Sequence, residues 1–397
     1  MTNFSASDPV VILSYARTAM GGLQGVFSDA SATELGAAAV KAAVERSGVA
    51  GEDFDRIYMG CVLPAGLGQA PARQAALKAG LPISVEATTV NKVCGSGMQT
   101  VIMGAEALAS SSIDLVIAGG MESMTNAPYL LKKHRSGARA GHDTAYDHMF
   151  LDGLEDAYDG GSMGSFAQAV ADEYQLTREA QDAYSIESLR RAQAAIASGA
   201  FVGEIVPVTV KTRGGDVVVD TDEQPGKGRP DKIPTLKPAF AKDGTITAAS
   251  SSSISDGAAA MVLTRQSVAD ARGLTPVARV VALSAHAHEP NRFPTTPVAA
   301  ITKLLAKAGW KIGDVDLFEI NEAFACVAMF AMHDLGIPHE KINVNGGATA
   351  LGHPIGASGT RIITTLIAAL KTKGLKRGVA SLCIGGGEAT ALAIELI

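Results

Sequence analysis

The chain has 397 residues, 47% of them hydrophobic and 19% charged, which is enough apolar material for a large core and excludes a disordered protein. Its net charge of −6 argues against a general nucleic-acid binder and against a polybasic membrane binder. Glycine is in excess, with 43 residues, or roughly 11% against a usual value of about 7%. The excess indicates many tight turns or close backbone approaches.

The cysteines are too few for a disulfide framework in a chain this long, and no pair has Cys-x-x-Cys spacing. We therefore expect reduced thiols and a cytoplasmic protein. Met1–Pro9 shows no basic region followed by an apolar run, so we expect no secretory signal. The longest apolar run, Ala323–Met332, is too short to span a bilayer.

In chain order, apolar runs with β-branched residues alternate with Ala-rich helical stretches. The first predicted helix, Ser31–Ser47, begins with a Ser31/Glu34 capping box and ends at Gly48. We predict strands at Val10–Ser14, Arg56–Met59, Leu115–Ala118, Asp256–Val262 and Val315–Ile320, and further helices at Thr177–Ser198 and Thr296–Ala308, the last capped by Thr296. The alternation predicts an α/β architecture with mostly parallel strands.

Short sequence matches recur in the same order near the two ends of the chain and indicate two copies of one α/β unit. The clearest are Val90-Asn91 with Val344-Asn345, Ser96-Gly97 with Ser358-Gly359, and 118–122 (AGGME) with 384–388 (IGGGE). The segment between the copies contains the turn-rich stretch Gln224–Pro230. We predict a first half at 1–120 plus 249–272, an inserted loop domain at 121–248, and a second half at 273–397.

Cys94 lies at a predicted strand-to-helix turn, within Asn91–Met98. Free N–H groups and the helix dipole at such a position are expected to lower the pKa of the thiol. The segment fits a nucleophilic cysteine, and it fits equally a buried structural cysteine, the usual role of this residue type.

Three other residues stand out. His353 lies in the glycine-rich loop 346–359 and suits acid–base or oxyanion chemistry, or a turn held by main-chain hydrogen bonds. Cys383 ends a strand before three glycines whose N–H groups can face an anion, although the cysteine itself could be incidental. Asn321 follows a strand at its carboxyl end, where ligands bind in α/β sheets, or it caps the next helix.

The remaining signals are weaker. His286 and His288, with Glu289, lack a further ligand, so we expect a surface loop and no metal site. Cys61 and Cys326 lie in apolar surroundings and are predicted to be core residues. Lys132–Arg135 is expected to be a solvated surface.

The Cys94 segment, Asn321–Phe324 and the Gly-His-Pro block leading to Cys383 together resemble the thiolase family, of the acetoacetyl-CoA thiolase type, over essentially the whole chain. The resemblance implies a thiolase fold: two similar βαβαβαββ halves packed as five αβαβα layers, with an inserted loop domain. It also implies reversible Claisen condensation of two acetyl-CoA molecules to acetoacetyl-CoA and CoA.

Residue by residue, Cys94 resembles the nucleophile that accepts the acetyl group in a ping-pong reaction. His353 resembles the residue that takes its proton and binds the thioester oxygen, and Asn321 the residue that holds a water in this first oxyanion hole. Cys383 resembles the acid–base for the α-carbon, and the N–H groups of Cys94 and Gly385 resemble the second oxyanion hole. No metal or other cofactor is implied, since CoA is itself substrate and product.

The resemblance also implies a CoA groove with walls that include Leu154, Met163, Phe240, Ala248, Ser252, Ala323 and Phe324. The chain departs from the family in two places: Ser162 stands where many short-chain thiolases have His, and Pro225 where some have an Arg at the adenosine end of CoA. Lys227 or Arg229 are candidates to compensate.

The alternatives are a broader 3-oxoacyl-CoA thiolase, of the β-oxidation or 3-oxoadipyl-CoA type, and a non-catalytic acyl-CoA-binding homologue. The stretch Thr125–Asp147 resembles a tetramerisation loop, so we expect a homotetramer that acts on acyl-CoA and binds neither nucleic acid nor membrane.

Overall fold

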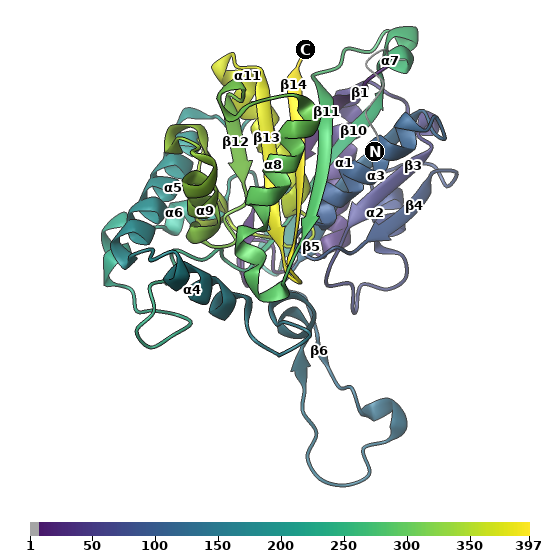
Figure 1. Cartoon of the computed structure of the whole chain (residues 1–397). Coiled ribbons are helices and arrows are strands. Elements are labelled where there is room, and N and C mark those ends of the chain that lie inside the picture. The colour runs from purple at the N-terminus through teal and green to yellow at the C-terminus, as the bar shows by residue number, and fades with distance from the viewer. Residues whose placement is uncertain (1–7) are drawn as a thin grey trace.

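The structure is a computed structural model that describes residues 8–397. Residues 1–7, most of the stretch in which a secretory signal was sought, lie outside the described residues. One sheet of ten strands runs through the molecule (Figure 1), in the order β12-β13-β14-β11-β1-β10-β5-β3-β4, with β2 (Gly21–Gly22) paired to β10. Its two ends are built from the two halves of the chain.

The first half contributes β1 (Val10–Arg17), α1 (Ala32–Ser47), β3 (Arg56–Gly60), α2 (Pro71–Lys78), β4 (Glu86–Val90), α3 (Ser96–Ala109), β5 (Leu115–Ser123), β10 (Ser255–Arg265) and α7 (Gln266–Arg272). The second contributes β11 (Ala278–Ala287), α8 (Thr296–Ala308), β12 (Leu317–Ile320), α9 (Ala325–Leu335), α10 (Ala348–Leu351), α11 (Ser358–Lys373), β13 (Arg377–Ile384) and β14 (Glu388–Leu396). The two halves meet where β1 pairs antiparallel with β11.

The prediction of mostly parallel strands is wrong. Only β3 with β4, β3 with β5, and β12 with β13 run parallel, and the other strand pairs of this sheet are antiparallel. Helical crossovers give parallel neighbours, but β10 returns after the long insertion and β14 after a tight glycine turn. Both therefore run back against their neighbours.

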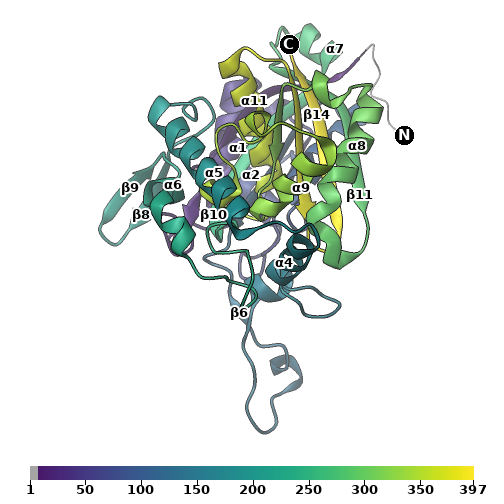
Figure 2. The ribbon, with the colours of Figure 1, turned by 60° about the vertical axis from the view of Figure 1, so that its left-hand side comes forward.

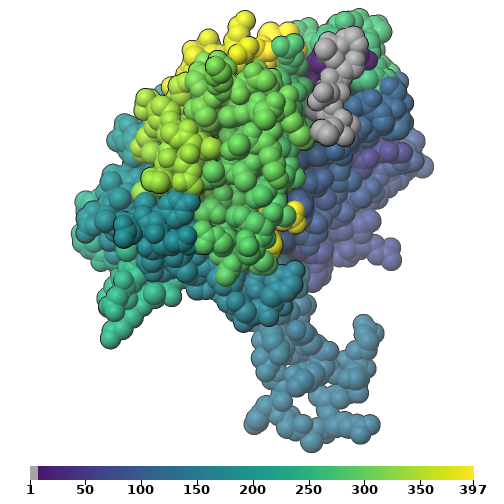
Figure 3. All heavy atoms as spheres, in the orientation of Figure 1, coloured from purple at the N-terminus to yellow at the C-terminus, as the bar shows by residue number. Residues whose placement is uncertain are grey.

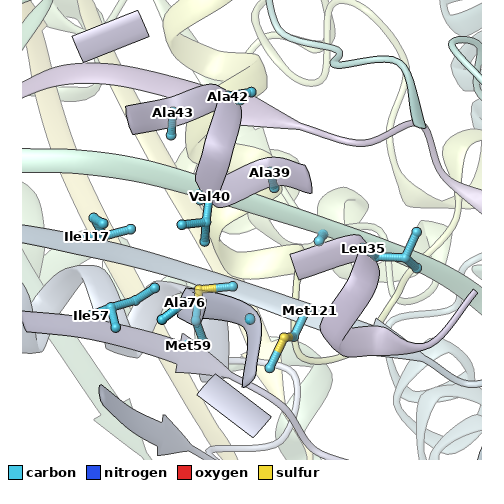
Figure 4. Close-up of a cluster of buried hydrophobic side chains, with 14 of the residues drawn as sticks. Leu35, Ala39, Val40, Ala42, Ala43, Ile57, Met59, Ala76, Ile117 and Met121 are labelled. Carbon is cyan, nitrogen blue, oxygen red and sulfur yellow. The ribbon is translucent and has the colours of Figure 1, made fainter. Parts of the chain in front are cut away.

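Three apolar clusters separate the layers. One packs α1 and α2 on the first half of the sheet and includes Leu35 and Val40 of α1 together with Ile57, Ile117 and Met121 (Figure 4). A second surrounds α3 and α11, which lie between the two halves, and a third packs α8 and α9 on the second half. The layers are, in order, α1 with α2, the first half of the sheet, α3 with α11, the second half of the sheet, and α8 with α9. This is the expected five-layer αβαβα arrangement.

The local helix signals hold with one exception. Ser31 caps α1 with both capping-box hydrogen bonds, and Gly48 ends it in the left-handed conformation. Thr177 caps α5. Thr296 does not cap α8: the helix begins at this residue, and its hydroxyl donates to the Phe293 and Glu388 carbonyls instead.

Between β5 and β10 the chain forms β6 (Tyr129–Leu130), β7 (Tyr146–Asp147), α4 (Met163–Glu173), α5 (Arg178–Ser198), β8 (Val208–Thr212), β9 (Gly215–Val219) and α6 (Glu223–Lys227). The loop joining β6 to β7 projects as a thin arm away from the body (Figures 1 and 3). The β8–β9 hairpin projects beside α6 (Figure 2). Across residues 8–397, no helix is both long and apolar enough to cross a membrane.

Part of the glycine excess serves close packing between the halves. A Cβ on Gly120 would lie 2.0 Å from the Gly356 carbonyl oxygen, one on Gly60 2.6 Å from it, and one on Gly97 3.0 Å from it. Three glycines of the first half therefore admit the backbone of the loop that follows His353. Cβ atoms do not approach other atoms this closely, so side chains are excluded there.

Candidate active site

Cys94 lies in a short turn between β4 and α3. Val93, just before it, has φ of +46°, which is unusual for a β-branched residue and costs on the order of 1–3 kcal/mol. Side chains hold the turn: Asn91 Oδ1 accepts the Val93 N–H at 2.9 Å, and Ser96 Oγ accepts the Lys92 N–H at 2.8 Å. The strained turn leaves the Cys94 thiol half-buried.

The Cys94 thiol is less acidic than its position at a helix N-terminus suggested. Burial raises its pKa to about 11, and the N–H groups of Gly385 and Cys94, which lower it, compensate only in part. The expected lowering of the pKa is therefore wrong, because desolvation outweighs the helix N-terminus. At neutral pH the resting thiol is protonated and needs a base.

His353 is a buried base in the same site. Burial, assisted by the nearby Arg361 cation, lowers the pKa of His353 to about 3, so the imidazole is neutral. Its Nδ1 lies 2.5 Å from Ser358 Oγ, which can donate its single proton to the Pro354 carbonyl at 2.9 Å. This network assigns the proton to Nδ1 and leaves the buried Nε2, which has no partner among the described residues, as an acceptor.

Cys383 and Asn321 come from the carboxyl ends of β13 and β12. Cys383, at the end of β13, is buried, and burial together with the neighbouring Cys94 raises the pKa of its thiol well above the usual value. Asn321 follows β12 and donates its backbone N–H to Ser381. It is not a helix cap, because α9 begins only at Ala325.

A cavity of about 220 Å³ brings Cys94, His353 and Gly385 together. Its walls include six of the residues predicted for the CoA groove, namely Leu154, Met163, Phe240, Ser252, Ala323 and Phe324. Asn321 and Cys383 do not line this cavity. The remaining lining residues, which sequence reasoning did not assign to the groove, are Phe150, Gly153, Ser162, Gly164, Ser251, Ile254, Phe293 and Ile355.

A second pocket, of about 300 Å³, shares Ser251 with the first and holds the other predicted CoA contacts, Ala248, Lys227 and Arg229. Lys232 also lines it. Lys227 is paired with Glu223, whereas no ion pair involves Arg229 among residues 8–397. The apolar cavity around Cys94 thus adjoins a basic pocket that suits a phosphorylated ligand.

Two buried ionic side chains that the sequence reasoning missed hold the site in place. Glu122 accepts the N–H groups of Val62, Leu63 and Gly356 at 2.9–3.1 Å and so ties the first half to the loop after His353. Arg361, within α11, contacts Asn321. The available signal was a charged residue inside an otherwise apolar segment, which is rarely buried without a partner.

One of the weaker predictions is wrong, because His286 lies within strand β11 and not on a loop. Cys61 and Cys326 are buried, as expected. His286 contacts Lys303, and His288 contacts a main-chain carbonyl. In the part of the chain that the structure describes, no three His, Cys, Asp or Glu side chains are grouped to hold a metal ion. Lys132–Arg135 is exposed.

Known proteins resemble this chain over nearly its whole length. An acetyl-CoA acetyltransferase of Thiocystis violacea is 47% identical over 391 residues, covering 98% of this chain and 99% of the relative. Acetyl-CoA acetyltransferase 2 of Arabidopsis thaliana is 49% identical over 391 residues, covering 98% and 97%.

Solved structures agree. The Bacillus anthracis acetyl-CoA acetyltransferase superposes with a TM-score of 0.96 at 39% identity, covering 98% of this chain and 99% of that one. Acat5 thiolase from Ascaris suum in complex with coenzyme A gives 0.94 at 41% identity, covering 98% and 100%. Residues 10–267 match the family described as "Thiolase, N-terminal domain", and residues 274–396 match "Thiolase, C-terminal domain". The chain therefore belongs to the thiolase family.

Proposed function

We propose that this thiolase is an acetyl-CoA C-acetyltransferase, which condenses two acetyl-CoA molecules to acetoacetyl-CoA and CoA and catalyses the reverse thiolysis. The observation that carries the proposal is the single cavity in which the Cys94 thiol, the neutral His353 and the Gly385 backbone meet. The relatives named above as acetyl-CoA acetyltransferases support the same reaction.

In the first half-reaction, Cys94 sulfur attacks the acetyl carbonyl carbon while its proton passes to His353 Nε2. The carbon–sulfur bond to CoA breaks, and Cys383 protonates the departing CoA thiolate. This leaves acetyl-Cys94, an imidazolium and a Cys383 thiolate. A neutral imidazole with a free Nε2 suits the first transfer, and a dry site strengthens the interaction between the two resulting charges.

In the second half-reaction, the Cys383 thiolate removes a proton from the methyl group of a second acetyl-CoA. The resulting carbanion attacks acetyl-Cys94, and the departing Cys94 sulfur recovers its proton from His353. Because burial raises the pKa of Cys383, its thiolate is a stronger base than an ordinary one. The N–H groups of Cys94 and Gly385 would stabilise the oxyanion on the acetyl group.

We further propose that CoA runs from the catalytic cavity past Ser251 into the basic pocket. Lys227 is engaged by Glu223, so Arg229 is the cation best able to bind a phosphate of CoA. This would compensate for Pro225 at the adenosine end. Arg229→Ala should raise the KM for acetoacetyl-CoA several-fold and leave kcat nearly unchanged.

The reaction as written needs no metal or other cofactor, and we propose that it proceeds without one, in the cytoplasm. We also propose a homotetramer. The arm around β6 and β7 exposes Tyr129, Leu131 and Tyr146, and apolar side chains gathered on a projecting segment favour contact with another subunit. Light scattering of a variant lacking residues 131–145 would test the assembly.

Steady-state thiolysis across acyl lengths tests the function. We expect kcat/KM for acetoacetyl-CoA to exceed that for six- to eight-carbon 3-oxoacyl-CoA substrates. A preference for the longer substrates would indicate a broader 3-oxoacyl-CoA thiolase. Tight CoA binding with no thiolysis at any length would indicate a non-catalytic homologue.

A further inference from the structure

Arg361 is one of the largest fully buried side chains of the chain. It comes from α11, and its two terminal nitrogens contact the strand end before the cavity: Nη1 lies 3.4 Å from Glu319 Oε2, and Nη2 lies 3.4 Å from Asn321 Oδ1. Burying a guanidinium is costly unless its partners compensate. Its position directly behind Asn321 therefore calls for an explanation.

The contact fixes which way the Asn321 amide faces. A guanidinium has hydrogen-bond donors and no acceptor, so only Oδ1 can face Arg361, and Nδ2 must face the other way. Asn321 Nδ2 is buried and has no hydrogen-bond partner among the described residues. An unsatisfied buried donor costs about 1–3 kcal/mol, so this N–H pair is suited to an oxygen that arrives with a ligand or a water.

A buried ionic network contacts the helix that carries Arg361. Arg17 of β1 pairs with Glu204 at 2.5 Å and with both oxygens of Asp222 at 2.7 and 2.9 Å. Thr365, one turn beyond Arg361 on α11, donates to Glu204 at 3.2 Å. The helix that carries Arg361 is thereby anchored in the first half of the molecule, which limits movement of the guanidinium.

The same cation also acts on the second member of the site, since Arg361 contributes to lowering the pKa of His353. Nε2 of His353 and Nδ2 of Asn321 are both buried and unpartnered within residues 8–397. One buried side chain is thus coupled to both groups that would bind the thioester oxygen.

We propose that Arg361 is a positioning residue for acyl transfer, which holds Asn321 so that its amide donor faces the thioester oxygen or a water bound to it. The proposal rests on the proposed function and adds to it a residue that positions Asn321 through the contact between Nη2 and Oδ1. If Arg361 only stabilised the fold, the effect of replacing it would not depend on whether Asn321 is present.

A double-mutant cycle separates the two roles. Arg361→Gln removes the donor-only partner, and we expect kcat for acetoacetyl-CoA thiolysis to fall about ten- to a hundredfold. In the Asn321→Ala background the same substitution should change kcat less than about twofold, because the group it positions is gone. Arg361→Lys, which retains a donor-only cation, should recover part of the loss.

Arg17→Gln is the matched control. Arg17 is equally buried in the same network but has no contact with Asn321, so its effect on kcat should be the same factor with and without Asn321. Alkylation of Cys94 by iodoacetamide, which involves no thioester oxygen, should be at least as fast in Arg361→Gln as in the wild type.

An equal loss from Arg361→Gln in both backgrounds would overturn the positioning role while leaving the proposed function intact. Absence of wild-type thiolysis would overturn both. If the Arg361 variants fail to fold, Asn321→Asp still decides: its carboxylate can face Arg361 but offers no amide donor. We expect a stable protein with little activity, and wild-type activity would contradict the proposal.

Discussion

The two copies of the α/β unit put nearly the same sequence to opposite uses. In the first copy, Gly119 and Gly120 lie inside strand β5, and Glu122 is fully buried. In the second, the matching residues Gly385 and Gly386 follow the end of β13. Gly386 and its neighbour Gly387 adopt φ of +91° and +87° and reverse the chain into β14. The segment of the first copy is packed inside the molecule, and the segment of the second copy is an open turn beside the cavity.

The two acidic residues that follow show the same contrast. Glu122 is enclosed by three backbone N–H groups, whereas Glu388 is 38% exposed and pairs with Lys92. In the proposed reaction, the first copy would supply the nucleophile and a rigid support, and the second would supply the base, the amide and the open glycine turn. The two similar units would thus have different roles in one active site.

The largest loss of activity should come from removing the Cys94 thiol, the group of the first copy that reacts in the proposed mechanism. Cys94→Ala should lower thiolysis by a factor of about 10⁴ or more, because no acyl-enzyme can form. The half-buried side chain contributes little to the core, so the melting temperature should stay close to that of the wild type. Turnover within tenfold of wild type would rule out Cys94 as the nucleophile.

The glycines test the contrast directly. A Cβ at Gly385 would lie 3.2 Å from the flexible Met163 side chain and at ordinary contact distance, 3.7 Å, from Val93. Gly385→Val should therefore reduce turnover at least about 100-fold by displacing an oxyanion donor, with little loss of stability. Gly120→Ala should behave in the opposite way. Its Cβ would lie 2.0 Å from the Gly356 oxygen, and it should destabilise the fold by about 3 kcal/mol or prevent folding.

Thermal unfolding with turnover measured on the folded fraction separates these outcomes. If Gly385→Val unfolded at room temperature, the glycine turn after β13 would be needed for folding, which would contradict its proposed role in turnover. A stable but inactive Gly120→Ala would place the first copy's glycines in the chemistry instead.

The acidic pair gives a smaller difference. Glu122→Gln turns a donor group toward backbone N–H groups and should cost about 2 kcal/mol of unfolding free energy. Glu388→Gln removes only a partly exposed ion pair and should cost at most about 0.5 kcal/mol. Denaturant titration of both variants measures the difference, and equal losses would contradict the proposed division of roles.

Glu122 should also make the stability of the fold depend on pH. Burial raises the pKa of Glu122 from 4.5 to about 7, so the folded state holds this proton more tightly than the unfolded chain does. Raising the pH from 4.5 to 7 therefore removes stability from the wild type. The stability difference between the wild type and Glu122→Gln should shift against the wild type over that interval, and an unchanged difference would contradict the shift.

Local signals in the sequence predicted much of this molecule, because capping boxes, glycine helix ends and apolar strands act over a few residues. They predicted Ser31–Ser47 as a helix and placed Cys94 at a strand-to-helix turn. The direction of β10 and β14 was not predictable in this way, because it depends on which strand a distant segment returns to. The pKa of Cys94 was also misjudged, since desolvation depends on neighbours contributed by the other half.

The contribution of Arg361 was hidden for the same reason. Its neighbours Ile362 and Ile363 indicate a buried helix, but only the packing of α11 against β12 brings the guanidinium to Asn321. The sequence indicates that a charge lies within a buried helix, and the structure shows which residue it contacts.

The most direct test of the central claim is to incubate the protein with acetyl-CoA alone, quench it with acid and map the acetyl group by peptide mass spectrometry. We expect one acetyl group on the peptide containing Cys94, and markedly slower labelling in His353→Ala. Labelling of Cys383 in preference to Cys94, or turnover with no acetyl-enzyme formed, would contradict the assignment of the nucleophile to the first copy and of its base to the second.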